Sequence, residues 1–211
     1  MDLSPMLLAT TNPHKLDKLR WLIKGLPIEC VTPSLLGIPP DTIPPELGAS
    51  HEAIARSKAV EWSRIASLPA IATDGGLRIP ALGDSWSSLT TGRFAGEGAT
   101  NREKALALLE AMASFKGGER RATWVEALAL AEEGRCVASW EVAGAEGVLL
   151  DELPSVVPDA GFWVFPLWYI PMFGKTYDQL GDGELAQIDD HWTQLRDRVR
   201  SFFRDHQKAK P

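Results

Sequence analysis

The sequence has little cysteine, no long apolar run and no excess of positive charge, and each shortage excludes a class of protein. Its two cysteines, Cys30 and Cys136, lie in apolar stretches, so we expect buried free thiols rather than a disulfide or a metal site. No run approaches the ~18 apolar residues of a membrane span, and the first residues lack the basic and apolar regions of a signal peptide. We therefore expect a soluble, cytoplasmic protein with no membrane partner.

The net charge and the length of the chain limit its possible partners and its domain organisation. The formal net charge is −6, which argues against a nucleic-acid polymer as partner because such binding requires a basic surface. A local basic pocket for a triphosphate is compatible with that charge. With 45% hydrophobic residues in a chain of 211, residues 1–211 can bury a sizeable core as a single domain, with one lobe or two.

Apolar runs alternate with helical patterns along the first half of the chain, which favours an α/β fold. We expect strands at residues 6–9, 28–31 and 69–73, and helices that begin after Asn12, Ser50 and Thr100. The second of these helices should end near Ala66, and Thr100 with Glu103 fits a capping box. The third strand should end at Asp74, because the two glycines that follow permit a tight turn.

The second half begins with strands of two kinds. Residues 124–131 are apolar except at Glu126, as in a strand covered on both faces. Residues 135–143 alternate, so one face should be exposed. The inward face would carry Cys136, Ala138, Trp140 and Val142. Residues 144–150 would extend that strand or pair with it.

The last helix combines an apolar stripe, expected in the core, with an arginine face, expected in solvent. The stripe comprises Ile188, Trp192, Leu195, Val199 and Phe202. The opposite face comprises Arg196, Arg198, Arg200 and Arg204.

A candidate phosphate site lies where the first strand runs into the first helix. Thr10 and Asn12 can donate hydrogen bonds, Lys15 adds a full positive charge, and a helix N-terminus attracts anions. Asn12 before Pro13 is equally a plain capping arrangement. These residues alone leave both interpretations open.

Two carboxylates, Glu46 and Asp74, are candidates for the divalent cation that triphosphate chemistry requires. Breaking the α–β phosphoanhydride bond needs a bound polyphosphate, a divalent cation and a water in line with the leaving pyrophosphate. Magnesium keeps several waters, so one or two carboxylates at a strand end or loop are enough. Taken singly, Asp74 is more simply a turn residue and Glu46 an exposed loop carboxylate.

The chain carries a series of motifs that resembles one family, the inosine triphosphate pyrophosphatase (Ham1-like) family, which acts on non-canonical purine nucleoside triphosphates. The motifs follow the family's order between about Met6 and Phe203. They are Thr10, Asn12 and Lys15; Glu46, Gly48, Lys58 and Ala59; Asp74–Leu77 with Ala81–Gly83; Gly92–Thr100; Gly161–Phe162 with Pro166; and Gly174–Tyr177. Each motif is weak by itself, but the ordered series is hard to obtain by chance.

The resemblance implies an α/β fold with a long mixed central sheet flanked by helices, and two lobes with an active-site cleft between them. It implies a homodimer, Mg²⁺ as cofactor with Mn²⁺ as a possible replacement, and hydrolysis of a nucleoside triphosphate to monophosphate and pyrophosphate. In that comparison Glu46 and Asp74 match metal-binding and water-activating acids. Asp74 and Lys58 would then be catalytic, and Lys175 would join Thr10, Asn12 and Lys15 in binding phosphate. Arg93 would reach a phosphate or a dimer partner, and the sequence does not choose between them.

The segments that family members use for the purine base depart from the pattern. Phe165 stands where the family has an acid before proline, and Asp189-Asp190-His191 stands where it has S-H-R, although a one-residue insertion would let His191 match the histidine. We expect a base pocket formed by Phe162, Val164, Phe165 and His191. Such a pocket offers stacking surface without the groups that would recognise a 6-keto purine.

The motifs assigned to phosphate and metal binding match the family pattern better than the base segments do, although they also depart from it at two places. Thr73 replaces the family's extra acid, and Ala53-Ile54-Ala55 replaces its E-N-A. Three functions stay open: a pyrophosphatase with altered or relaxed base preference, a catalytically silent nucleotide-binding relative, and a pyrophosphatase for another substrate such as a modified pyrimidine triphosphate or a nucleotide conjugate. Product release under magnesium separates the second from the others, and a substrate panel separates the first from the third.

Overall fold

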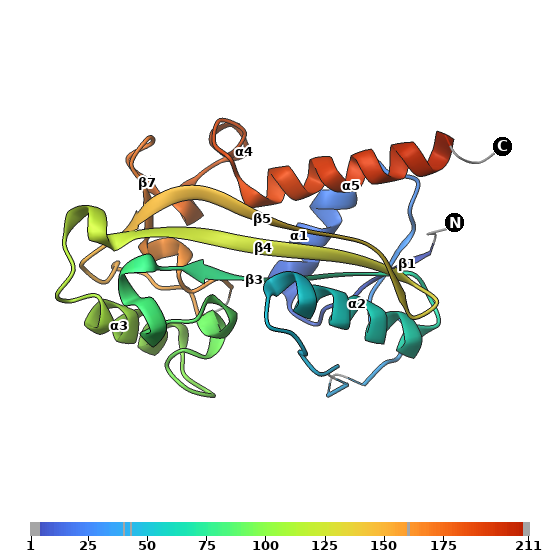
Figure 1. Ribbon diagram of the computed structural model, residues 1–211, viewed down its shortest axis with the longest axis horizontal. Coiled ribbons are helices and arrows are strands. Elements are labelled where there is room, and N and C mark those ends of the chain that lie inside the picture. The colour runs from blue at the N-terminus through green and yellow to red at the C-terminus, as the bar shows by residue number, and fades with distance from the viewer. Residues whose placement is uncertain (1–4, 40, 43, 160, 209–211) are drawn as a thin grey trace. The chain divides into compact units, whose positions relative to one another are not determined.

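The computed structural model of the protein describes residues 5–39, 41–42, 44–159 and 161–208, and its described strands form one seven-stranded sheet (Figure 1). The strand order is β2-β1-β3-β4-β5-β6-β7. The strands are β1 (Met6–Leu8), β2 (Cys30–Val31), β3 (Ala70–Arg78), β4 (Arg121–Glu132), β5 (Arg135–Leu149), β6 (Trp168–Ile170) and β7 (Lys175–Thr176). β1 pairs in parallel with β2 and β3, whereas β6 pairs antiparallel with β5 and β7. The expected mixed sheet is confirmed.

Helices alternate with the strands in the first half of the chain, as expected for an α/β fold, and among the described residues β4 to β7 follow one another without an α-helix between them. They are α1 (Pro13–Ile23), α2 (His51–Ala66), α3 (Asn101–Ala111), α4 (Asp182–Leu185) and α5 (His191–Lys208). The chain divides into two compact units, which we call unit 1 (Met1–Asp74, Glu126–Val142 and His191–Pro211) and unit 2 (Gly75–Val125 and Ala143–Asp190). That residues 1–211 form one domain with a cleft between two lobes stays a prediction. In the described part of the chain, every helix is too short or too polar to cross a lipid bilayer.

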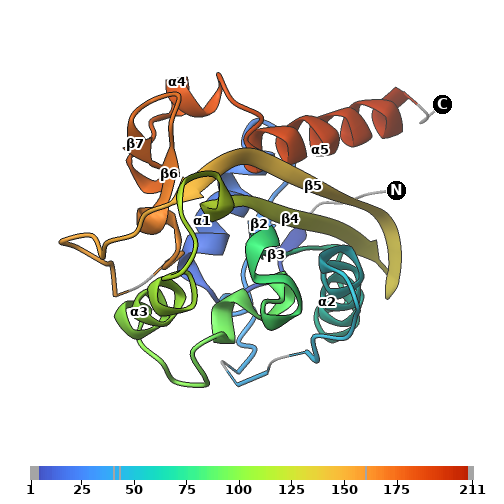
Figure 2. The ribbon, with the colours of Figure 1, turned by 60° about the vertical axis from the view of Figure 1, so that its left-hand side comes forward.

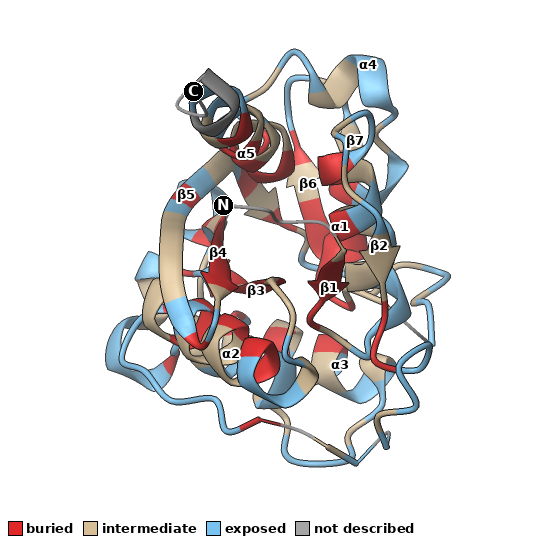
Figure 3. Ribbon diagram, turned by 90° about the vertical axis from the view of Figure 1, so that its right-hand side faces the viewer, coloured by how far each residue is buried: buried red, intermediate tan, exposed pale blue. Residues whose placement is uncertain are grey.

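In unit 1, helices cover both faces of the strands: α1 and α5 lie on one face and α2 on the other (Figure 3). The inner face of α2 presents Ala55, Ala59 and Trp62, which pack with Leu7 and Ala9 and with a row of alanines. Small side chains on both elements allow the helix to lie close to the strands. α2 therefore brings its first and middle turns next to the end of β1 and the middle of β3, where the candidate site residues lie.

The arginine face of α5 is only partly solvated, so that prediction is wrong for two of its members. The guanidinium carbon of Arg196 lies 4.3 Å from the centre of the Trp21 ring, and Arg200 donates a hydrogen bond of 2.7 Å to the carbonyl of Lys24. Both contacts reach α1, because the long aliphatic stems of the arginines lie along the neighbouring helix. The apolar stripe of α5 is buried as expected at Trp192, Leu195 and Val199, with Phe203 more buried than Phe202 and Ile188 just before the helix.

Unit 2, to which α3, β6 and β7 in Figure 2 belong, is built around a cluster of aromatic side chains. The ring of Phe165 lies 4.5 Å from that of Tyr177 and 5.0 Å from that of Trp124, measured between centroids. Trp168 stacks on Tyr177 at 4.8 Å. Residues of α3 such as Leu108 complete this core, and the predicted capping box at Thr100 that starts α3 is confirmed.

β3 does not end at Asp74, so the predicted tight turn at Gly75-Gly76 is wrong. The strand continues to Arg78, and Gly76 serves a different purpose from a turn. A Cβ atom at this position would lie 1.9 Å from the carbonyl oxygen of Ser88. Glycine is needed there because the segment around Ser88 approaches the strand backbone, an approach that Thr91 secures by accepting a 3.0 Å hydrogen bond from the amide of Leu77.

Three smaller expectations about strands also change. β2 is shorter than residues 28–31, because the amide of Ile28 bonds within a turn to Leu26. β5 runs unbroken to Leu149, so residues 144–149 extend it. In the first half of β5 the expected difference in burial between the two faces is small. Cys136, Ala138 and Trp140, expected to be buried, are only half-buried. Ser139, expected to be exposed, is partly covered because it donates a 2.5 Å hydrogen bond to Glu52. Both cysteines are free, and both are half-buried rather than buried.

Candidate active site

The turn between β1 and α1 forms the first wall of the site. Asn12 caps α1, since its side-chain oxygen accepts hydrogen bonds from the amides of His14 at 2.9 Å and Lys15 at 3.3 Å. The hydroxyl of Thr10 in turn accepts a 3.1 Å bond from the amide of Asn12. Capping is therefore confirmed, and it fixes the start of the helix from which Lys15 extends. Phosphate binding by Thr10, Asn12 and Lys15 stays a prediction.

Helix α2 forms the second wall and carries two polar side chains on one face. Ser50 caps it by accepting a 3.1 Å hydrogen bond from the amide of Ala53. His51 and Lys58 are separated by about two helical turns, so they point to the same side of the helix. Both reach the carboxylate of Asp74, in the middle of β3.

Asp74 is bonded through both of its carboxylate oxygens. His51 Nδ1 lies 2.7 Å from Oδ2, and Lys58 Nζ lies 2.9 Å from Oδ1. The same ammonium lies 2.6 Å from Oε1 of Glu46, which approaches on the preceding loop. Lys58 thus links the two carboxylates that the sequence singled out, and we call Glu46, Lys58 and Asp74 the charged cluster.

Burial and charge act in opposite directions on this cluster. Burial alone would raise the pKa of Asp74, but the hydrogen bond from His51 and the charges of Lys58 and Lys15 outweigh it and hold that pKa below the usual aspartate value. Burial alone would lower the pKa of Lys58, but the charge of Asp74 and the bonds to Asp74 and Glu46 hold that pKa above the usual lysine value. At neutral pH Asp74 is a carboxylate and Lys58 an ammonium.

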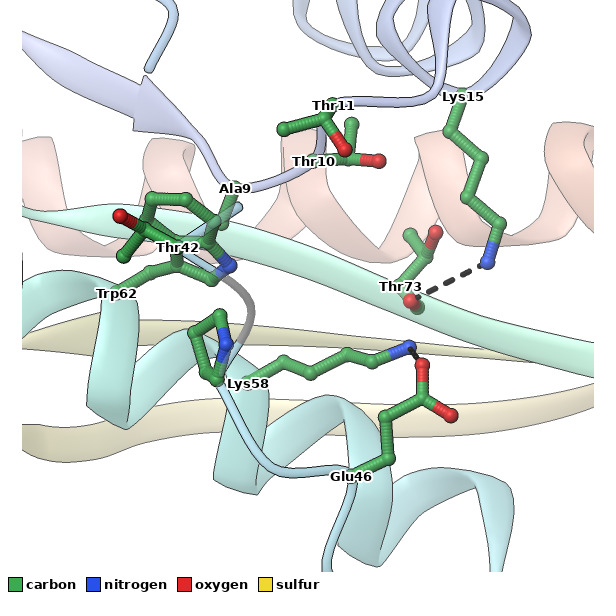
Figure 4. Close-up of a pocket in the computed structure, with 10 residues that line it drawn as sticks. Ala9, Thr10, Thr11, Lys15, Thr42, Glu46, Lys58, Trp62 and Thr73 are labelled. Carbon is green, nitrogen blue, oxygen red and sulfur yellow. Dashed lines mark hydrogen bonds and ion pairs between the residues drawn. The ribbon is translucent and has the colours of Figure 1, made fainter. Parts of the chain in front are cut away.

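A pocket of about 110 Å³ opens beside this cluster (Figure 4). Its lining comprises Ala9, Thr10, Thr11, Lys15, Thr42, Pro44, Glu46, Lys58, Trp62 and Thr73. Lys15 extends from α1 to donate a 3.5 Å hydrogen bond to the carbonyl of Thr73, and Lys58 extends from α2 toward Glu46. The hydroxyl of Thr73 is buried and has no partner among the described residues. Buried hydroxyls in native proteins are normally bonded, so this hydroxyl is available to a ligand or a water that enters the pocket.

The residues present fit a magnesium ion of the kind that keeps most of its water ligands. In the described ranges no three histidine, cysteine, aspartate or glutamate side chains converge as a complete metal site. Glu46 and Asp74 nevertheless lie close enough to share a cation, because one ammonium contacts both. A pair of carboxylates is what magnesium commonly takes from a protein when phosphate and water complete its shell.

The structure brings together Thr10, Lys15, Glu46, Lys58 and Asp74 in unit 1, and Asn12 caps the helix that carries Lys15. Lys175 lies in unit 2, where its ammonium contacts Glu184 at 2.6 Å. Arg93 is exposed in the same unit. These two residues keep their predicted roles only as predictions.

The four residues predicted to form the base pocket are largely buried. Val164 and Phe165 lie in the aromatic core of unit 2, and the ring of Phe162 stacks on Phe165 at 4.7 Å. His191 is fully buried at the first residue of α5, in unit 1. Packing among aromatic side chains therefore accounts for Val164 and Phe165, and base recognition by these four residues stays a prediction.

His51 is the site residue that sequence reasoning missed. It follows a capping serine, a position that reads as an ordinary helix start. The available signal was its spacing to Lys58, which places both on one face of a helix. With Asp74 expected in a turn rather than inside a strand, nothing indicated that this face would meet a carboxylate.

The chain is similar in sequence and in structure to proteins of one family. The model of the Ham1 family matches residues 6–192. A protein named dITP/XTP pyrophosphatase from Thermus thermophilus is 34% identical over 93% of this chain and 91% of its own length. One of the same name from Desulfotalea psychrophila is 31% identical over 87% of this chain and 79% of its own length. A solved structure of a HAM1 protein from Coxiella burnetii is 28% identical and superposes with a TM-score of 0.78, covering 96% of this chain and 99% of that one.

Proposed function

This chain belongs to the Ham1 family, and from that premise we propose that it hydrolyses nucleoside triphosphates at the α–β phosphoanhydride bond, releasing a monophosphate and pyrophosphate. The observation that carries the proposal is the charged cluster of Glu46, Lys58 and Asp74 beside a pocket that also receives Lys15. Two ammonium groups suit a polyphosphate, and two carboxylates suit its divalent cation.

Each residue then has a role that follows from its chemistry. Lys15 and Thr10 bind phosphate oxygens at the start of α1, where the helix dipole adds its own attraction. Glu46 and Asp74 hold Mg²⁺, with Mn²⁺ as a possible replacement. The metal supplies charge neutralisation for the phosphates. Asp74, kept ionised by its surroundings, orients and deprotonates the attacking water, and Lys58 stabilises the charge that develops on the phosphates.

We propose inosine and xanthosine triphosphates, with their deoxy forms, as the first substrates to test. Relatives of this chain carry the name dITP/XTP pyrophosphatase, and both of those bases are 6-keto purines. The replacements at Phe165 and Asp189-Asp190-His191 favour a weaker preference for such bases, since aromatic stacking does not distinguish one base from another. The same replacements support a second candidate, a pyrophosphatase for a different triphosphate, such as a modified pyrimidine.

A substrate panel tests this proposal. Purified protein is incubated with inosine, xanthosine, adenosine, guanosine and modified pyrimidine triphosphates under Mg²⁺, and pyrophosphate release is followed, with a metal chelator as control. Release from one or more purines supports the first candidate, and release from pyrimidines alone supports the second. If every triphosphate binds but none is hydrolysed, the chain is a silent nucleotide-binding relative and the proposal fails. The homodimer and the cytoplasmic location accompany this proposal as predictions.

A further inference from the structure

In the roles given above, the bond between His51 and Asp74 serves only to keep Asp74 ionised, although it is among the most buried polar contacts near the pocket. His51 is 3% exposed, and its Nδ1 atom lies 2.7 Å from Oδ2 of Asp74. A carboxylate can only accept hydrogen bonds, so Nδ1 carries the proton and donates it. The bond is charge-assisted and shielded from water, both of which strengthen it.

Among the described residues, the side chains of His51 and Lys58 hold Asp74 in different ways. Lys58 reaches Oδ1 on a flexible stem and shares its ammonium with Glu46, so this contact can be exchanged when a nucleotide or a cation enters. His51 has two side-chain torsions, sits in a buried position at the first residue of α2, and bonds the other oxygen. Among the described contacts of Asp74, it is therefore the histidine bond that can keep the carboxylate oriented while Lys58 changes partner.

We propose that His51 is a positioning residue for Asp74 in the triphosphate hydrolysis proposed above: by holding Oδ2 it keeps Oδ1 directed toward Lys58. The inference rests on that proposed function, because positioning matters only if Asp74 takes part in the reaction. His51 itself touches neither the substrate nor the water that attacks it. Small losses of orientation at a reacting group lower the rate more than they lower binding.

Two variants separate positioning from packing. His51→Asn keeps a donor near the place of Nδ1, whereas His51→Leu removes the donor and retains apolar bulk. We expect His51→Leu to lower kcat by about tenfold or more with KM changed by less than about threefold, and His51→Asn to recover most of kcat. Thermal unfolding of both variants shows whether either has lost its fold.

The bond can also be observed without turnover. The chain has four histidines, so a ¹⁵N spectrum of the imidazole groups is simple enough to assign. We expect a slowly exchanging Nδ1–H signal that is absent from His51→Asn and shifted in Asp74→Asn. This readout uses the protein without nucleotide or metal, and it reports the hydrogen bond whether or not the protein is active.

The outcomes distinguish this inference from the function on which it rests. Loss of kcat in His51→Leu, recovery in His51→Asn and the expected Nδ1–H signal support positioning. An active parent whose His51→Leu variant keeps the parental kcat overturns the inference and leaves the proposed function standing. Equal loss in both variants, or a spectrum in which Nδ1 lacks the proton, also overturns it. A parent that hydrolyses no triphosphate overturns the proposed function and the inference together.

Discussion

The two units of this protein differ in the kind of side chain that they bring together. In unit 1, residues from three separate segments meet in one charged cluster, where Glu46, Lys58 and Asp74 are bonded to one another. In unit 2, the segment that carries Phe162 and Phe165 packs its rings into an aromatic core. Charges brought together at a cost in desolvation indicate a binding function, whereas aromatic rings packed together are sufficiently explained by stability. Unit 1 therefore gives the firmer indication of chemistry.

The largest effect on turnover is expected from a substitution in the charged cluster of unit 1. Asp74→Ala should lower turnover by about a hundredfold or more, because under the proposed function it removes a metal ligand and the group that activates water. Steady-state pyrophosphate release from the best substrate measures the loss. Asp84→Ala, at an exposed carboxylate in unit 2, is the matched control and should keep the parental rate. A parental rate in Asp74→Ala would remove the basis for contrasting the two units.

Base selectivity tests the aromatic side of the comparison. Strong discrimination requires buried donors and acceptors that the wrong base leaves unpaired, and the segment around Phe165 offers mainly apolar rings. We expect inosine and xanthosine triphosphates to be preferred over adenosine and guanosine triphosphates by less than about a hundredfold in kcat/KM. A preference above about a thousandfold would show that polar groups elsewhere recognise the base.

A smaller effect is expected at the start of α1. Lys15→Ala should raise KM by about tenfold for every triphosphate alike, because in the proposed function the lysine contacts phosphate and no base. Calorimetry with a non-hydrolysable analogue measures the affinity directly. Lys24→Ala removes an exposed lysine at the far end of the same helix and should leave affinity unchanged. Unequal losses among bases would place Lys15 near the base instead.

The sequence predicted correctly those structural features that depend on residues close together in the chain, and it failed for features that depend on distant residues. The caps at Asn12, Ser50 and Thr100 were predicted correctly, because a cap depends on residues within one turn. The continuation of β3 through Asp74 depends on Ser88, which approaches Gly76 from a later segment. No local pattern contains that information.

The charged cluster shows the same division. Glu46, Lys58 and Asp74 were selected singly by residue type and by the order of motifs, and the structure joins them. His51 could not be selected, because its role depends on Asp74 lying inside a strand next to α2. The burial of Phe165 among other rings was likewise invisible to a pattern that places it beside a proline.

The smallest expected effect concerns stability. Since the folded state holds the pKa of Asp74 below its usual value, the carboxylate stabilises the fold above its unfolded pKa, and that contribution is lost as pH falls through the folded pKa. The difference in free energy of unfolding between the parent and Asp74→Asn should therefore be largest near about pH 7 and shrink toward about pH 3. Urea denaturation without divalent cations measures it, with Asp84→Asn as control. A difference that grows on acidification would contradict the stated pKa direction.

The most direct test of the central claim, that the charged cluster of unit 1 cleaves the α–β bond of a triphosphate, is the identity of the products. Phosphorus NMR of inosine triphosphate incubated with the protein and Mg²⁺ should show inosine monophosphate and pyrophosphate appearing together, with neither formed by Asp74→Ala. Appearance of diphosphate and orthophosphate, or an unchanged triphosphate spectrum across the whole substrate panel, would contradict the claim.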